Sequence, residues 1–213
     1  YNTGGSTTGW VPGAASALGL KSSDFEKQAK GGAGFRHPAN TSPNETFTDL
    51  LNTATLAKED VGRIIVCGGY NDHIYTVIQL LESFGTFATK AREKYPFADS
   101  TRVGIYGHSG GGFMTVAAML AKPDFYKVGV AASGNHDNNI YRQQWAETFH
   151  GVQNTGSCFT CKVPTNIENA GNLKGKLLLI TGDIDDNVHP AGTYRLVNAF
   201  IKKKKKFDMM VFP

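Results

Sequence analysis

The 213-residue sequence has only three cysteines and no run of about 18 apolar residues. Without such a run, no segment is expected to span a membrane as a helix. Cys158 and Cys161 form a single C-x-x-C, and no second pair completes the four ligands that a structural zinc ion needs. A local disulfide and two free thiols both remain compatible with this pair.

Charge is also sparse, since Asp, Glu, Lys and Arg make up 19% of the residues against 40% hydrophobic ones. Such a chain buries a core and is long enough for one domain. The net charge of +4 includes five consecutive lysines, Lys202 to Lys206. They could form a nucleic-acid-binding arm or the solvated end of a helix, where cations suit the dipole. No aromatic residue interleaves the run, which favours the helix end and no nucleic-acid partner.

Residues 1 to about 60 are rich in Gly, Ser, Thr, Asn and Pro and show little periodicity, apart from a short helix signal at residues 22–26. From residue 62 onwards, short apolar runs alternate with helical patterns. Near-continuous apolar strands alternating with helices predict a parallel sheet with helices on both faces. The predicted strands are 63–67, 102–106, 128–132, 176–181 and 207–212, and the predicted helices are 74–94, 112–121, 138–150 and 190–203.

One short motif is typical of nucleophilic catalysis. Residues 107–111 read Gly-His-Ser-Gly-Gly and match G-x-S-x-G, between a predicted strand and a predicted helix. In this setting a tight turn exposes a strained serine, and its neighbours must be small. We therefore expect Ser109 to be a nucleophile and the backbone N–H of Gly110 to be an oxyanion donor. The alternative is a glycine-rich turn that merely connects strand and helix.

A serine nucleophile needs a base and an acid that orients the base. In folds with this motif the chain order is Ser, then Asp or Glu, then His. Three aspartates follow the strand at 176–181, and the spacing Asp-x-x-Val favours Asp185 over Asp183 and Asp186. The two rivals are expected to cap the next helix or close the turn.

The base should follow the next strand, but the sequence ends at Pro213, directly after that strand. His189 is the one histidine beyond Asp185, and it lies on the same loop. We interpret it as a structural loop residue, with the role of base as the alternative. His108 lies inside the turn, and we expect its side chain to point away from the nucleophile's side.

Several separated segments resemble the prolyl oligopeptidase family, in the branch with dipeptidyl peptidase IV and acylaminoacyl peptidases. The likeness covers roughly residues 90 to 213 and implies the α/β-hydrolase fold, with a mostly parallel sheet and helices on both faces. The segments that carry it are 95–99, 102–113, 124–127, 138–141 and 182–190.

The resemblance implies a serine peptidase that cleaves short peptides, often after proline or a small residue, through an acyl-enzyme intermediate. A dipeptidyl or prolyl-type aminopeptidase is the natural form of this activity. By motif position the resemblance supports Ser109 and Asp185, and it suggests that Tyr141 and Trp145 line a substrate pocket and that Asn187 contacts a substrate carbonyl. Tyr141 and Trp145 also have the i, i+4 spacing of core residues on a helix, so a packing role stays open.

The implied partner is a peptide, with no metal or organic cofactor, and a homo-oligomer is one option. Secretion or a periplasmic location is compatible with the family. We expect residues 1–213 to form one catalytic domain, with 1–60 irregular and poorly matched. The family's N-terminal β-propeller and a histidine just after Pro213 would lie outside the sequence. Two other functions fit the same residues, namely a carboxylesterase or lipase and a catalytically incomplete hydrolase-like protein.

Overall fold

The computed structural model describes residues 46, 49, 52, 86, 89–96, 99, 101–154, 156 and 159–213, the last range without the side chains of 159–161. The chain divides into two compact units, residues 1–98 and 99–213. In the first unit, residues 86 and 89–94 are helical, within the helix predicted for 74–94. The predicted strand 63–67 and the short helix signal at 22–26 lie outside the described residues.

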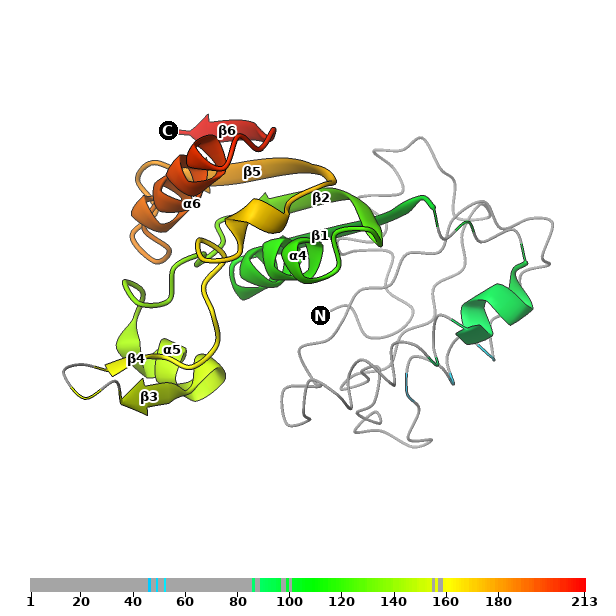
Figure 1. The fold of residues 1–213 in the computed structure, drawn as a ribbon, viewed down its shortest axis with the longest axis horizontal. Coiled ribbons are helices and arrows are strands. Elements are labelled where there is room, and N and C mark those ends of the chain that lie inside the picture. Colours follow the sequence, from blue (N-terminus) through cyan, green and yellow to red (C-terminus); the bar gives the residue numbers. More distant parts are fainter. Residues whose placement is uncertain are drawn as a thin grey trace, which may run out of the picture. The chain divides into compact units, whose positions relative to one another are not determined.

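The second unit is built on a parallel four-stranded sheet (Figure 1). Its strands are β1 (Val103–His108), β2 (Tyr126–Ala132), β5 (Lys176–Gly182) and β6 (Asp208–Phe212). Their order across the sheet is β1-β2-β5-β6, and each neighbouring pair is parallel. All four strands agree with the apolar runs of the sequence, to within two residues at their ends.

Two helices cover one face of this sheet. They are α4 (Gly110–Ala121) and α6 (Ala191–Lys202), which lie on the same side of the strands in Figure 1. Together with alternate residues of β2 and β5 they form the hydrophobic core. The fully buried members of that core are Val116, Met119, Leu120, Ala131, Leu177, Leu179, Leu196 and Phe200.

The other face of the sheet is apolar as well but more exposed. Alternate strand residues point to opposite faces, so this face carries Tyr106, Val128, Met210 and Phe212. Their exposed fractions are 58%, 49%, 46% and 53%. Helices on both faces therefore remain a prediction, because both described helices that pack on the sheet lie on one face.

A smaller substructure lies beside the sheet between β2 and β5 in the chain. It holds α5 (Gln143–His150) and the antiparallel pair β3 (Val152–Asn154) and β4 (Phe159–Cys161), and it is followed by the 3₁₀ helix η4 (Ala170–Asn172) (Figure 1). The sequence did not predict β3, β4 or η4. The cysteine pair lies here, but Cys158 and the side chain of Cys161 are outside the described part of the chain.

The helix predicted for 138–150 was wrong in its first part, because α5 begins only at Gln143. Asparagine and aspartate side chains hold the preceding residues in a loop. The Asn135 amide donates to Oδ1 of Asn138 at 2.5 Å, and the Asn139 N–H donates to Oδ1 of Asp137 at 3.2 Å. Such local hydrogen bonds compete with those of a helix.

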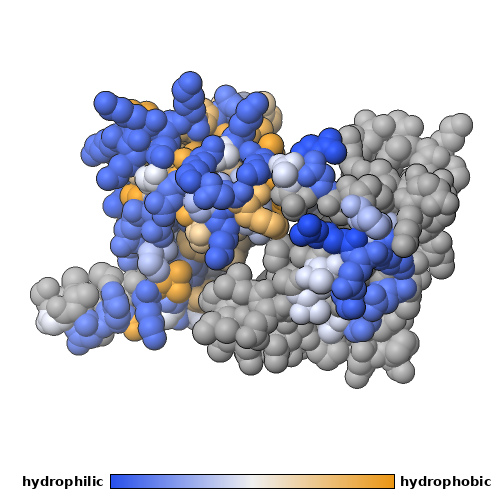
Figure 2. All heavy atoms as spheres, turned by 45° about the vertical axis from the view of Figure 1, so that its right-hand side comes forward, coloured by the Kyte–Doolittle hydropathy of each residue, from blue (hydrophilic) through white to orange (hydrophobic). Residues whose placement is uncertain are grey.

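No helix among the described residues is both long and apolar enough to cross a membrane. On the side shown in Figure 2, hydrophilic atoms cover much of the described surface and apolar atoms show between them. Of the lysines that follow α6, all except Lys205 are exposed. This agrees with their interpretation as a solvated helix end.

Candidate active site

Ser109 lies in the turn between β1 and α4, with φ 58° and ψ −123°. This is a strained conformation for a residue other than glycine. The backbone holds it on both sides, because the Ser109 N–H donates to the Ala132 carbonyl at 2.9 Å and the Ser109 carbonyl accepts the Phe113 N–H at 3.1 Å. Strand, sharp turn and helix follow one another as the G-x-S-x-G pattern requires.

Glycines make the turn possible. A Cβ added at Gly107 would lie 2.2 Å from the Gly111 carbonyl oxygen, and one at Gly112 would lie 2.6 Å from the Ala132 carbonyl oxygen. The backbones of β1, β2 and α4 therefore approach more closely at Gly107 and Gly112 than a residue with a side chain would allow. Ser109 stands directly before the first residue of α4, Gly110, whose N–H is among those left without an intrahelical acceptor.

Asp185 lies on the loop between β5 and α6 and is held by the backbone of its own loop. Its Oδ1 accepts the N–H of Val188 at 2.9 Å and the N–H of Asn187 at 3.0 Å. The Ser133 hydroxyl also hydrogen-bonds to the carboxyl group, and His108 is close enough to act on it electrostatically. The pKa of Asp185 is lowered, most of all by the Val188 hydrogen bond. Burial is the next-largest effect and opposes this, whereas the hydrogen bonds of Asn187 and Ser133 and the charge of His108 add to the lowering.

The rival aspartates are placed differently. Asp183 and Asp186 are exposed, whereas Asp185 is partly buried. The Asp183 N–H donates to the Phe212 carbonyl at 2.9 Å and so extends the pairing of β5 with β6. This bond uses the Asp183 backbone, so the helix-capping and turn-closing roles expected for the rival side chains stay predictions.

Ser109 and Asp185 lie at the same edge of the sheet. Each follows the carboxyl end of a parallel strand, β1 and β5, and only β2 lies between these strands. Two strand spacings amount to about 10 Å. Ser133, which follows β2, bridges part of this distance through its hydrogen bond to Asp185. The carboxyl edge of parallel strands is also where reactive groups of open α/β sheets gather.

Trp145 packs against the turn that carries Ser109. A Cβ added at Gly110 would lie 3.2 Å from ring atom Cζ2 of Trp145. The Trp145 ring meets Tyr141 edge to face, with the centroids 5.6 Å apart. Tyr141 precedes α5, so the expected i, i+4 placement of both residues on one helix was wrong, although their rings do meet.

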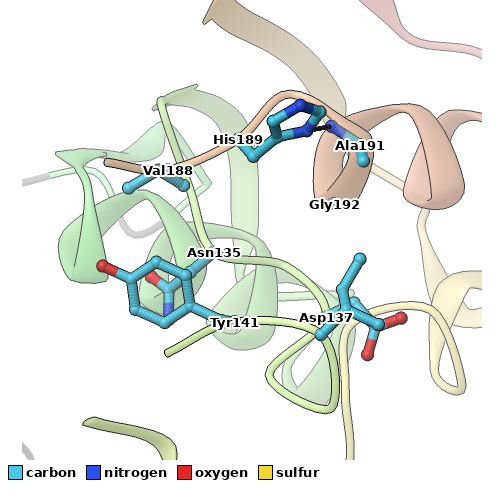
Figure 3. A pocket seen from close by; sticks show the side chains of 8 residues that line it. Asn135, Asp137, Tyr141, Val188, His189, Ala191 and Gly192 are labelled. Carbon is cyan, nitrogen blue, oxygen red and sulfur yellow. Dashed lines mark hydrogen bonds between the residues drawn. The ribbon is translucent and has the colours of Figure 1, made fainter. Parts of the chain in front are cut away.

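Tyr141 also lines a cavity of about 100 Å³ beside the Asp185 loop. Figure 3 shows Val188 and His189 on one side of it, and Tyr141 and Asn135 on the other. Ile140, Asp137, Ala191 and Gly192 complete its lining. Asn187 is exposed next to the cavity without lining it, so its predicted contact with a substrate carbonyl stays a prediction.

Comparison with known proteins places this arrangement in a family. The model of the prolyl oligopeptidase family matches residues 79–213, which is well over half of the chain. The chain belongs to the prolyl oligopeptidase family. The match contains the whole described sheet, the Ser109 turn and the Asp185 loop.

Individual relatives of this family member are dipeptidyl peptidases. Human dipeptidyl peptidase 8 is 30% identical over 122 residues, which cover 56% of this chain and 14% of that protein. Probable dipeptidyl-aminopeptidase B of Trichophyton verrucosum is 29% identical over 193 residues, 83% of this chain and 21% of that one. Inactive dipeptidyl peptidase 10 of mouse is 30% identical over 129 residues, 59% of this chain and 16% of that one.

Solved structures agree with the fold. A crystal structure of a putative dipeptidyl aminopeptidase IV from Bacteroides ovatus matches with a TM-score of 0.53 and 31% identity, over 62% of this chain and 19% of that chain. The structure of Porphyromonas gingivalis dipeptidyl peptidase 4 matches with a TM-score of 0.53 and 28% identity, over 61% and 18%. The α/β-hydrolase fold predicted from the sequence is thereby confirmed, and the chain spans about a fifth or less of these relatives.

Within this family member, the described histidines after Ser109 have other tasks. Nδ1 of His189 accepts the N–H of Ala191 at 3.1 Å, at the start of α6 (Figure 3). This fits the structural role expected for it. His136 is fully buried, and burial lowers its pKa to about 3, so it is neutral at physiological pH.

The orientation of His108 relative to the nucleophile's side stays a prediction. Its charge is the smallest of the effects that lower the pKa of Asp185. His108 is the last residue of β1 and is exposed, and its face of the sheet carries Tyr106.

Sequence reasoning missed a buried polar network behind the site. The Asn166 amide donates to the Phe113 carbonyl and to Nδ1 of His136, both at 3.0 Å, and the Asn166 N–H donates to the His136 carbonyl at 3.1 Å. Asp137, only 4% exposed, pairs with Arg195 of α6 at 3.1 Å. The run of polar residues 135–139 directly after an apolar strand was the available signal, because polar groups so placed need partners.

Proposed function

We propose that the protein is a serine peptidase in which Ser109 is the nucleophile, Asp185 is the triad acid and the Gly110 N–H is an oxyanion donor. The observation that carries the proposal is the strained Ser109 at the start of α4, on the same sheet edge as a carboxylate whose pKa is lowered. Because one relative is named inactive, family membership alone does not establish catalysis. A serine in this conformation supports it.

In the proposed reaction, the Ser109 hydroxyl attacks the peptide carbonyl and its proton passes to a histidine, which we expect just after Pro213. The oxyanion is stabilised by the Gly110 N–H and the N-terminus of α4. The histidine then protonates the leaving amine, and the C–N bond breaks to give an acyl-enzyme. Water, activated by the same histidine, releases the acyl group and restores Ser109. Asp185 stays ionised and orients the histidine.

The dipeptidyl peptidases among the relatives suggest that short peptides are the substrates and that cleavage follows the second residue. Tyr141 and Trp145 are proposed to line the pocket for the residue before the scissile bond, and Asn187 to contact a substrate carbonyl. The cavity beside Tyr141 and its nearness to the Asp185 loop support the first of these roles.

Labelling with a fluorophosphonate tests the nucleophile. In the full-length protein we expect one labelled site, at Ser109, and loss of the label in Ser109→Ala together with a fall in hydrolysis of about 10⁵-fold or more. Thr148→Ala, which removes an exposed hydroxyl on α5, is the matched control and should label normally. A folded wild-type protein that takes no label would refute the proposal.

Paired substrates test the peptidase activity against the esterase alternative. We expect turnover of an aminoacyl-prolyl anilide as well as of a nitrophenyl ester, since acyl-enzyme chemistry serves both. Fast ester turnover without amide turnover would favour a carboxylesterase on the same fold.

A further inference from the structure

The position of the Trp145 ring decides how much space is free at the start of α4. Its Cζ2 atom would lie 3.2 Å from a Cβ at Gly110, the residue after Ser109. A ring this close to the turn forms a wall next to the proposed nucleophile. Whatever holds the ring therefore helps to determine which acyl groups fit beside Ser109.

Three aromatic rings surround Trp145. The centroids of Phe149, His150 and Tyr141 lie 4.8, 5.4 and 5.6 Å from that of Trp145. Phe149 is 43% exposed and Tyr141 is partly exposed, whereas His150 is only 6% exposed. His150 is thus the buried support of the ring.

His150 is itself fixed from two sides. Its ring meets Phe113 of α4 edge to face, with the centroids 4.7 Å apart. The Asn138 amide nitrogen lies 3.2 Å from Nε2 and 3.3 Å from Nδ1. Burial lowers the pKa of His150, so the ring is neutral at physiological pH and accepts this hydrogen bond. Asn138 in turn accepts from Asn135 at 2.5 Å.

We infer that His150 is a positioning residue that holds the Trp145 ring against the turn at Gly110 and thereby limits the size of the acyl group accepted by Ser109. This inference rests on the proposed function. His150 touches neither substrate nor the reacting atoms, and it acts through Trp145. Contacts of this kind fix a side chain's orientation without adding a group to the reaction.

The test compares His150→Ala and His150→Phe with wild type in the full-length protein, using one small and one bulky alkyl fluorophosphonate. Without the His150 ring, Trp145 can move aside for the bulky group. We therefore expect His150→Ala to raise the ratio of the bulky to the small inactivation rate about tenfold, the lower limit of the discrimination that one methylene group gives in a hydrophobic pocket. His150→Phe keeps a ring against Phe113 and Trp145 and should restore most of the wild-type ratio. Thr148→Ala, on the solvent side of the same helix, should leave the ratio unchanged.

A spectroscopic measurement makes the test independent of activity. Trp145 is one of two tryptophans, so Trp10→Phe isolates its emission. In that background we expect a red shift in His150→Ala and little shift in His150→Phe. If His150→Ala does not fold, His150→Gln takes its place, because it can still hydrogen-bond to Asn138 but lacks the ring.

The two proposals fail in different ways. An unchanged rate ratio and unchanged emission in every folded His150 variant, with wild type still labelled, would overturn the positioning role alone. Wild type that reacts with neither probe would overturn the proposed function, whereas the emission would still report whether His150 holds Trp145.

Discussion

The turn after β1 and the loop after β5 present side chains at the same sheet edge but are fixed in different ways. The first is fixed by its backbone, since Ser109 has φ 58° and glycines on both sides leave no room for a side chain. The second is fixed through a side chain, since the Asp185 carboxylate accepts hydrogen bonds from the N–H groups of Asn187 and Val188.

The difference fits the roles proposed for the two groups. The Ser109 side chain makes no capping hydrogen bond to α4, as suits a hydroxyl proposed to react. The Asp185 carboxylate is held in place by hydrogen bonds that also lower its pKa and keep it ionised. The proposed nucleophile, positioned by its backbone, and the proposed acid, positioned by its own hydrogen bonds, should therefore respond differently to substitution.

The largest effect is expected for Asp185→Asn. The amide oxygen can still accept from the loop backbone, so the loop should persist while the charge that orients the base is lost. We expect peptide hydrolysis to fall about 10⁴-fold with little change in folding. Steady-state kinetics and thermal unfolding of the full-length protein measure the two effects.

Asp186→Asn is the matched control, because this neighbouring carboxylate is exposed and its removal should cost less than tenfold in rate, by the ordinary tolerance of surface positions. If Asp186→Asn were the more damaging of the two substitutions, the assignment of the acid would be wrong.

The steric side of the comparison is tested by Gly107→Ala. The added Cβ would meet the Gly111 carbonyl oxygen at 2.2 Å, so β1 and α4 would have to move apart. We expect a loss of about 3 kcal/mol or more in the free energy of unfolding. Denaturant titration measures it.

Gly111→Ala gives the opposite expectation in the same turn. A Cβ there meets nothing within 4 Å, and the residue lies in α4. This variant should be neutral or gain about 0.5 to 1 kcal/mol, since alanine favours the helix. Equal losses in both glycine variants would mean that close approach does not explain the glycines.

The loop after β2 adds a pH test, because it is held by a buried neutral histidine. Burial lowers the pKa of His136 to about 3, below its value near 6.5 in the unfolded chain. Below pH 6.5 His136 is protonated in the unfolded state but not in the folded state. The free energy of unfolding should therefore fall by about 1.4 kcal/mol per pH unit as the pH drops towards 3.

His136→Gln should flatten this dependence while keeping a group that hydrogen-bonds to Asn166. Urea titrations at pH 7, 6 and 5 on both proteins provide the comparison. A wild-type slope that does not exceed that of the variant would contradict the buried neutral histidine.

The smallest expected change in the free energy of unfolding concerns Lys204, a residue with a strained backbone that lies outside the proposed site. Lys204 has φ 55° just after α6, and the N–H groups of Lys204 and Lys205 donate to the carbonyls of Ile201 and Phe200, each at 2.9 Å. Glycine is favoured at this position of a helix end. Lys204→Gly should stabilise the protein by up to about 1 kcal/mol, whereas Lys206→Gly, which has no positive φ, should not. Equal effects of the two would argue against strain at Lys204.

The sheet and the Ser109 turn were predictable because their signals are local. Each strand of the four-stranded sheet is a short apolar run, and the serine turn is marked by Gly107 and Gly112, where a Cβ would clash with backbone. Asp185 was distinguished from its rivals by its spacing to Val188, and that valine is buried and donates its N–H to the carboxylate.

The region between β2 and β5 was less predictable because its structure depends on contacts between distant residues. Asn166 hydrogen-bonds to Phe113 and His136 across 53 and 30 positions of the chain, and Asp137 pairs with Arg195 of α6. These distant partners hold residues 136 and 137, directly before the predicted helix. The strands β3 and β4 have only three residues each, which is too short for alternation of apolar and polar residues to mark a strand.

The parallel order of the strands also has a consequence for how the proposed site is assembled. The turn at Ser109 needs β1, α4 and the end of β2, whose Ala132 carbonyl accepts the Ser109 N–H, but Asp185 arrives at the same edge only after β5 has also paired with β2. Parallel pairings between distant segments form slowly. We therefore expect a newly made chain to hold Ser109 in place before Asp185, so that the proposed pair is complete only when β5 has joined the sheet.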